Sequence, residues 1–183
     1  MLALHNHIIL IGFKHTGKSA IGKCLAQVLQ APYIDLDHKI EEMYEDETGI
    51  KSTCRDIMQE KQEKYFRLLE IKTLSQTINS QQSIISLGGG TPMHAENQRL
   101  IKSSILVHVT AERGTVFERI LMSGRPAFFN PEENLLESFN NLWNQREKVY
   151  VKIRDISVEN NGKIEDAIAR IIGLLNLKES VNE

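Results

Sequence analysis

The chain has 183 residues, of which 41% are hydrophobic and 25% are charged, a balance typical of a globular protein with a full core. Its 22 basic and 24 acidic residues give a formal net charge of −2, which argues against a dedicated nucleic-acid-binding protein, since such proteins carry a basic excess. The two cysteines cannot form a disulfide framework, and no apolar run approaches the ~20 residues that span a bilayer. The N-terminal segment lacks a signal-peptide pattern, so we expect a cytoplasmic protein without a membrane partner.

Short apolar runs alternate with segments of helical periodicity along the chain. The runs predict strands at 8–11, 33–37, 83–87, 105–109 and 156–158. Helices are predicted at 20–29, 40–49, 53–79, 95–101, 112–122, 135–153 and 164–175, with a loop at 123–134. Continuous apolar strands between helices are typical of a parallel sheet covered on both faces. The sequence therefore predicts one α/β domain over residues 1–183.

A phosphate-binding loop follows the first strand. Residues 12–19 read Gly-Phe-Lys-His-Thr-Gly-Lys-Ser and match the pattern G-x-x-x-x-G-K-[ST] at every required position. The glycines let successive backbone N–H groups wrap a phosphate, and the helix that follows adds its positive end. We expect Lys18 to reach the outer phosphates of a nucleotide and the Ser19 hydroxyl to bind Mg²⁺.

The second strand ends in two acids, Asp35 and Asp37, whereas the third and fourth strands end without a carboxylate. In an open α/β sheet this end lies on the same edge as the phosphate loop. We expect both carboxylates on one side of an extended segment, one holding hydrated Mg²⁺ and the other meeting a substrate hydroxyl. The alternative is that Asp37 only caps the helix that follows.

From about Ile8 to Arg170 the sequence resembles the shikimate kinases, through the order and spacing of several short motifs. These are 12–19 with Gly22, 33–37 with Ile40-Glu41, Thr48-Gly49, Phe66-Arg67 with Glu70, Gly88-Gly89-Gly90, Gly124-Arg125-Pro126, and Arg146 with Tyr150. The resemblance implies a P-loop fold like that of the nucleoside monophosphate kinases, a three-layer sandwich with a five-stranded parallel sheet in the order 2-3-1-4-5. It also implies transfer of the ATP γ-phosphoryl group to the 3-hydroxyl of shikimate, in aromatic amino acid biosynthesis.

The resemblance further implies a role for each site residue. Asp37 matches the catalytic base, and Asp35 matches the acid that orients Mg²⁺ through water. Arg67 and Arg146 match two arginines that clamp the substrate carboxylate, a task that suits bidentate guanidinium groups. Helices within 37–79 and the glycines Gly88, Gly89 and Gly90 complete the substrate site. Lys18 and Arg125 match catalytic cations, and Arg125 lies in a lid at 123–134. The resemblance implies these ATP contacts: Gly12, Lys14, His15, Thr16, Gly17, Lys18, Ser19, Ala20, Arg119 and Arg125.

The chain also departs from the family pattern. His15 and Gln62 stand where the family commonly has glycine, and Lys14 replaces a small or apolar residue. None of these changes removes a group that the chemistry needs. We expect a monomer that uses ATP, shikimate and Mg²⁺ and binds no nucleic acid. A kinase for another small hydroxy acid such as gluconate, a nucleotide kinase, and a nucleotide-binding module without catalysis remain as alternatives.

Overall fold

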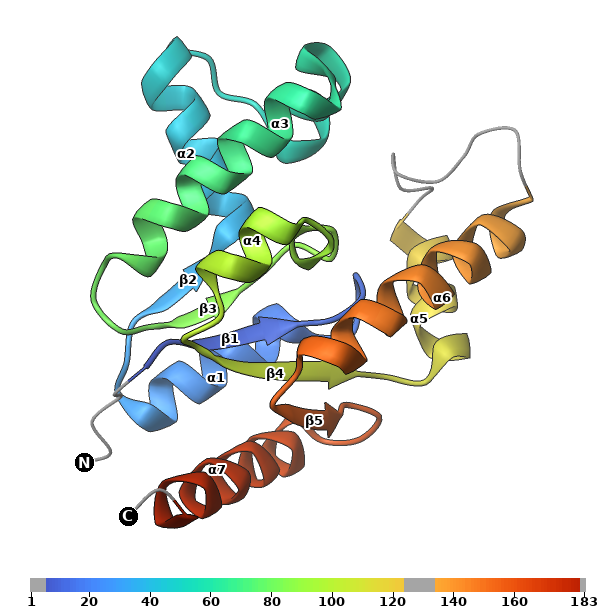
Figure 1. Cartoon of the computed structure of the whole chain (residues 1–183). Coiled ribbons are helices and arrows are strands. Elements are labelled where there is room, and N and C mark those ends of the chain that lie inside the picture. The colour runs from blue at the N-terminus through green and yellow to red at the C-terminus, as the bar shows by residue number, and fades with distance from the viewer. Residues whose placement is uncertain (1–5, 124–133, 182–183) are drawn as a thin grey trace.

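The computed structural model describes residues 6–123 and 134–181, with side chains described as far as residue 176. Five strands form one parallel sheet in the order β2-β3-β1-β4-β5, which confirms the order that the family resemblance implies (Figure 1). The strands are β1 (Ile8–Ile11), β2 (Tyr33–Asp35), β3 (Ile84–Ser86), β4 (Ile105–Thr110) and β5 (Ile156–Glu159). Within the described residues, no helix is long and apolar enough to cross a membrane.

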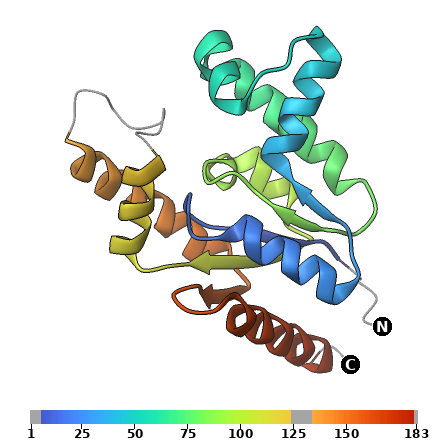
Figure 2. The same ribbon diagram turned by 180° about the vertical axis from the view of Figure 1, so that it is seen from behind.

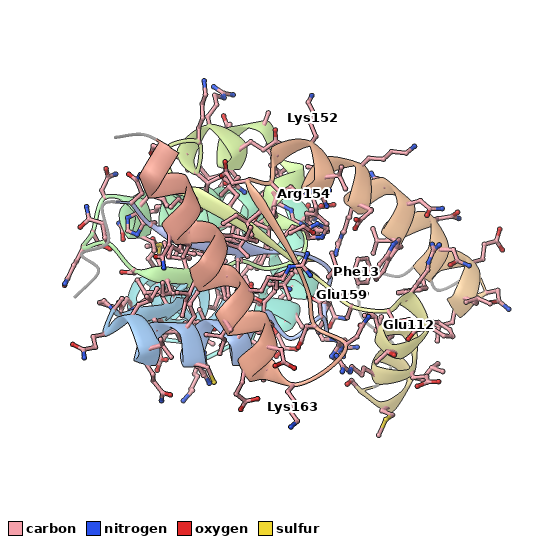
Figure 3. All side chains as sticks on the ribbon, turned by 90° about the horizontal axis from the view of Figure 1, so that it is seen from below. Phe13, Glu112, Lys152, Arg154, Glu159 and Lys163 are labelled. Carbon is pink, nitrogen blue, oxygen red and sulfur yellow. The ribbon has the colours of Figure 1, made fainter. Side chains whose placement is uncertain are left out.

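Helices cover both faces of the sheet. On one face α1 (Lys18–Leu29) and α7 (Ile164–Val181) lie side by side, as the view from below in Figure 3 shows. The other face is covered by α2 (Leu36–Thr48), α3 (Cys54–Ile78), α4 (Ala95–Leu100) and α6 (Leu135–Ile153), with a 3₁₀ turn at Thr91–Met93. Helix α5 (Arg113–Ser123) packs with the first half of α6 beyond the end of β4, and α2 with the first half of α3 stands out on the opposite side (Figure 2).

The central strand β1 explains why the sheet needs cover on both faces. All four of its residues are fully buried, and alternate side chains of a strand point to opposite faces. Ile8 and Leu10 pack with α1 and α7, whereas Ile9 and Ile11 pack with α2, α3 and Tyr150 of α6. Full burial of each isoleucine contributes roughly 1.5–3 kcal/mol to folding. The phosphate loop thus starts from a fully buried strand at the centre of the sheet.

Two of our expectations about local structure are wrong. The segment 53–79 is predicted as one continuous helix, but Gln62 interrupts α3 with φ 69° and ψ 158°, a conformation that strongly favours glycine. Asp35 to Asp37 is predicted to be extended, but α2 already begins at Leu36. Asp35 is the N-cap, because its side chain accepts the Asp37 backbone N–H at 3.2 Å. Asp37 is therefore free of the capping role and lies in the first turn of the helix.

Candidate active site

A cavity of about 450 Å³ opens at the carboxyl ends of β1, β2 and β3. This volume falls in the range of sites that hold small metabolites. The phosphate loop, both acids, both predicted clamp arginines and the glycine triplet all face it. Its lining residues are Lys14, His15, Gly17, Lys18, Ser19, Ala20, Asp35, Asp37, Cys54, Arg55, Met58, Phe66, Arg67, Glu70, Ser86, Leu87, Gly88, Gly89, Gly90, Ser123 and Arg146. Segments more than 100 residues apart in the sequence therefore meet in one cavity.

The backbone of the phosphate loop depends on positive φ angles. Gly12 has φ 144°, and a Cβ there would collide with the Val109 carbonyl oxygen. Gly17 has φ 93°, and a Cβ there would collide with the Asn160 side chain. His15 adopts φ 66° without being a glycine, so the loop keeps the left-handed conformation at this position although the side chain disfavours it.

Three side chains hold this loop from outside or within. Asn160, which follows β5, donates its side-chain amide to the Thr16 carbonyl at 2.9 Å. Arg119 of α5 donates to the His15 carbonyl at 2.9 Å, and the Thr16 hydroxyl donates to the Phe13 carbonyl at 3.0 Å. Arg119 therefore bonds to the backbone of the loop and is not among the residues that line the cavity. Its contact with adenine stays a prediction.

The Lys18 side chain is buried against the backbone of the phosphate loop. Its buried Nζ donates to the Phe13 carbonyl at 2.8 Å and to the Gly12 carbonyl at 3.0 Å. Burial lowers the pKa of Lys18 to about 8, against which the nearby Asp37 carboxylate favours the charged form. An incoming phosphate would restore a full counter-charge to this ammonium group.

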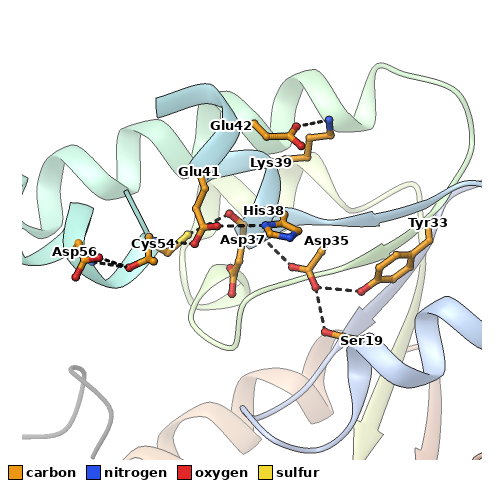
Figure 4. A network of polar contacts seen from close by, with 11 residues as sticks. Ser19, Tyr33, Asp35, Asp37, His38, Lys39, Glu41, Glu42, Cys54 and Asp56 are labelled. Carbon is orange, nitrogen blue, oxygen red and sulfur yellow. Dashed lines mark hydrogen bonds and ion pairs between the residues drawn. The ribbon is translucent and has the colours of Figure 1, made fainter. Parts of the chain in front are cut away.

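The two acids lie in different surroundings. Asp35 accepts hydrogen bonds from the Ser19 hydroxyl and the Tyr33 hydroxyl, each at 3.1 Å (Figure 4). Asp37 faces the solvent of the cavity but is enclosed by protein on its other sides. This loss of hydration, followed by repulsion from Asp35, raises the pKa of Asp37 to about 6. A carboxylate with this pKa can accept a proton near neutral pH.

Arg67 is oriented by a buried carboxylate. Its Nη1 lies 3.0 Å from Glu70 Oε2, and the Glu70 side chain is only 3% exposed. The other oxygen of Glu70 accepts the Thr91 hydroxyl at 2.7 Å, and Asn97 donates to Oε2 at 3.3 Å. Because these contacts fix the carboxylate, they fix the guanidinium group that is bound to it.

Arg146 comes from α6 and meets Arg67 across the glycine triplet. It is buried, with its guanidinium carbon 5.4 Å from the centre of the Phe13 ring, and burial lowers its pKa. A Cβ added at Gly90 would lie 3.5 Å from Arg67 Nη2 and 3.6 Å from Arg146 Nη2. The two guanidinium groups thus converge on one point, as a clamp for a carboxylate requires.

The backbone of the glycine triplet approaches Asp37 and Arg146 closely because it carries no Cβ atoms. A Cβ at Gly88 would lie 2.6 Å from Asp37 Oδ1, and one at Gly89 would lie 3.0 Å from Arg146 Nη1. The Tyr150 hydroxyl donates to the Gly89 carbonyl at 2.5 Å and holds the turn against α6. Any larger residue at Gly88 would displace the acid.

The oxygen groups at this edge fit a hydrated divalent cation that arrives with a nucleotide. Ser19 Oγ and Asp35 Oδ2 are 3.1 Å apart, and both are hard oxygen donors of the kind that Mg²⁺ prefers. Among residues 6–123 and 134–176 no group of three or more His, Cys, Asp or Glu side chains is placed to hold a metal by itself. The residues present therefore suit an ion whose remaining ligands are phosphates and water.

Comparisons with known proteins show the family of this chain. The family model described as shikimate kinase matches residues 15–176. The chain belongs to the shikimate kinase family. The shikimate kinase of Persephonella marina is 34% identical over 159 residues, which cover 86% of this chain and 90% of that protein. A bifunctional shikimate kinase/3-dehydroquinate synthase of Thermotoga maritima is 28% identical over 94% of this chain, which spans only 33% of that longer protein.

A solved shikimate kinase has the same fold. The enzyme of Acinetobacter baumannii, solved in complex with shikimate, superposes with a TM-score of 0.81 at 25% identity and covers 94% of each chain. As a member of the shikimate kinase family the chain is an ATP-dependent kinase. Arg125 and most of the predicted lid lie outside the described residues, so their roles stay predictions.

Sequence reasoning missed several residues of the cavity. Cys54, Arg55 and Met58 line it from the start of α3. This end of α3 is docked on α2, because the Cys54 backbone N–H donates to Glu41 at 2.9 Å and its thiol donates to the Asp37 carbonyl at 3.2 Å. Burial raises the pKa of the Cys54 thiol, so this group is a structural donor and not a nucleophile. Thr53, an N-cap residue, was the one available signal for where this helix begins.

Proposed function

We propose that this chain transfers the γ-phosphoryl group of ATP to the 3-hydroxyl of shikimate, giving shikimate 3-phosphate and ADP. The observation that carries the proposal is the shared cavity, in which a phosphate loop, an acid and two converging guanidinium groups meet. The family supports both substrates. The protein would act as a cytoplasmic monomer, with 1–183 forming one kinase domain, and would bind neither nucleic acid nor membrane.

The acceptor would be held by its carboxylate. In our proposal Arg67 and Arg146 bind it from two sides, while the backbone of Gly89 leaves room for the ring next to Arg146. Lysine could not replace these groups, since a bidentate contact needs a planar fork. The clamp would turn the opposite side of the ring toward Asp37 and Lys18.

Asp37 would accept the proton of the attacking hydroxyl. With a pKa of about 6 the Asp37 carboxyl is still mostly ionised at neutral pH, and it is a stronger base than an ordinary aspartate. Lys18 would leave its carbonyl partners in the loop and bind the β- and γ-phosphates. Arg125 and the 123–134 lid would close over the phosphates and exclude water.

The divalent cation would be Mg²⁺, held by the Ser19 hydroxyl and, through water, by Asp35. When bound, it would neutralise charge on the β- and γ-phosphates. Asp35 would keep its place at the end of β2 because its other oxygen caps α2. Gly12, Lys14, His15, Thr16, Gly17 and Ala20 would complete the nucleotide site, with Arg119 next to the adenine.

An acceptor panel tests the proposal. Purified protein is mixed with MgATP and, separately, with shikimate, gluconate or a nucleoside monophosphate, and ADP release is followed in a coupled assay. We expect saturable turnover with shikimate and background turnover with the others. Equal or faster turnover with gluconate would favour the alternative acceptor, and tight ATP binding with no turnover on any acceptor would favour a non-catalytic module.

A further inference from the structure

Asp35 is the point at which three elements meet (Figure 4). Its Oδ1 accepts the Asp37 backbone N–H at 3.2 Å, and its Oδ2 accepts the hydroxyls of Ser19 and Tyr33, each at 3.1 Å. Asp37 belongs to α2, Ser19 to α1 and Tyr33 to β2. Ser19 and Asp35 have the metal-binding role proposed above, whereas the Tyr33 hydroxyl has no role so far.

Tyr33 is held in place independently of the nucleotide. It is half-buried and does not line the cavity. Its ring packs on the backbone of α1, since a Cβ at Gly22 would lie 2.5 Å from the ring carbon Cε2. Its hydroxyl donates to Asp35 Oδ2 at 3.1 Å, so Tyr33 is a fixed donor to this carboxylate.

Ser19 is the other hydroxyl that donates to Asp35 Oδ2. A hydroxyl that binds a cation through an oxygen lone pair keeps its O–H donor, so Ser19 can bind the ion and still donate to Asp35. Asp35 and Ser19 line the cavity whereas Tyr33 does not, so Tyr33 is the donor to Asp35 that comes from outside the cavity lining.

We propose that Tyr33 is a positioning residue: its hydroxyl fixes the Asp35 carboxylate where the water shell of the nucleotide-bound metal needs an acceptor. The inference rests on the metal-binding part of the proposed function and not on the identity of the acceptor. Partners of metal-binding groups change metal affinity by about 10- to 100-fold. We expect the lower end for Tyr33, because Asp35 keeps its bond to the Asp37 N–H.

The test measures ADP binding by calorimetry over a series of Mg²⁺ concentrations, with the full chain. The quantity compared is the Mg²⁺ concentration that gives half of the full gain in ADP affinity. Tyr33→Phe should raise this concentration about tenfold. Its ADP affinity in EDTA should stay within about twofold of that of the unaltered protein. Tyr65→Phe is the matched control, since this α3 tyrosine packs edge-on against Tyr44 outside the cavity, and it should change neither quantity.

A second variant separates positioning from a general structural effect. In an Asp35→Asn background Tyr33→Phe should change the Mg²⁺ dependence less than about twofold, because the tyrosine acts through the carboxylate. An unchanged Mg²⁺ dependence in Tyr33→Phe, an equal loss of ADP affinity with and without Mg²⁺, or an undiminished effect beside Asp35→Asn would each overturn the proposal. Failure of the proposed acceptor would appear in the acceptor panel and leave these titrations unchanged.

Discussion

Glu70 offers a direct way to perturb the clamp without touching an arginine. Glu70→Gln preserves the size of the side chain and an acceptor for Thr91 but removes the charge that binds Arg67 Nη1 at 3.0 Å. A hydrogen bond to a charged group contributes about 1.5–3 kcal/mol. The substitution also has an opposite effect, because Arg67 no longer shares its charge with Glu70. Its attraction to an anionic substrate would then increase by about 1 kcal/mol in an open, hydrated cavity. The loss from the misplaced guanidinium group therefore exceeds this gain by roughly 0.5–2 kcal/mol.

The substitution should therefore raise the KM for shikimate about tenfold and leave the KM for ATP within about twofold. Steady-state kinetics with each substrate varied in turn measures both. Glu63→Gln is the matched control, because Glu63 also contacts Arg67 but lies 3.4 Å away and is 70% exposed. Exposed ion pairs contribute little, so this control should change KM less than about twofold. A lower KM in Glu70→Gln, or equal effects in the two variants, would refute the assigned orientation of Arg67.

Three further predictions address the base and the fold. Below about pH 6 the carboxylate of Asp37 gains a proton, so kcat/KM for shikimate should fall about tenfold per pH unit. Asp37→Asn should abolish turnover and leave ATP binding nearly intact. Because the pKa of Asp37 is raised in the folded state, this group lowers the free energy of unfolding as pH rises from about 4 to about 6, and Asp37→Asn should remove that decrease. The Tyr44 hydroxyl is buried without a hydrogen-bond partner in the described structure. Tyr44→Phe should therefore raise the free energy of unfolding, measured by urea titration, by about 1 kcal/mol. A decrease of that size would contradict the burial of an unpaired hydroxyl at this position. Gln62→Gly should relieve the positive φ in α3 and raise the thermal midpoint, whereas a lower midpoint would show that the glutamine side chain contributes more than the strain costs.

The parts of the site that the sequence predicts well are those encoded by local chemistry. Two glycines, a lysine and a serine at fixed spacing define the phosphate loop, and buried apolar runs define the strands that carry it. The sheet order implied by the family then brings Asp35 and Asp37 to the same edge. The convergence of Arg67 and Arg146 followed from the family resemblance and not from periodicity, since both lie on long charged helices.

The parts that the sequence does not predict depend on contacts between distant residues. Glu70 reaches Thr91 and Asn97, which lie 21 and 27 residues further along the chain. Arg119 bonds to the backbone carbonyl of His15 in the phosphate loop, 104 residues away in the sequence. No local pattern encodes such pairs, because they exist only once the helices have packed on the sheet. The break at Gln62 has a signal only in the family resemblance, since the family commonly has glycine there, whereas the helix-forming neighbours of Gln62 indicate a continuous helix.

The most direct test of the shared cavity is a crystal structure of the chain with shikimate and MgADP. The account predicts the shikimate carboxylate between Arg67 and Arg146, the 3-hydroxyl within about 3 Å of Asp37, and the β-phosphate of ADP bound to Lys18. Shikimate bound elsewhere, or bound in the cavity with its carboxylate turned away from both arginines, would contradict the central claim.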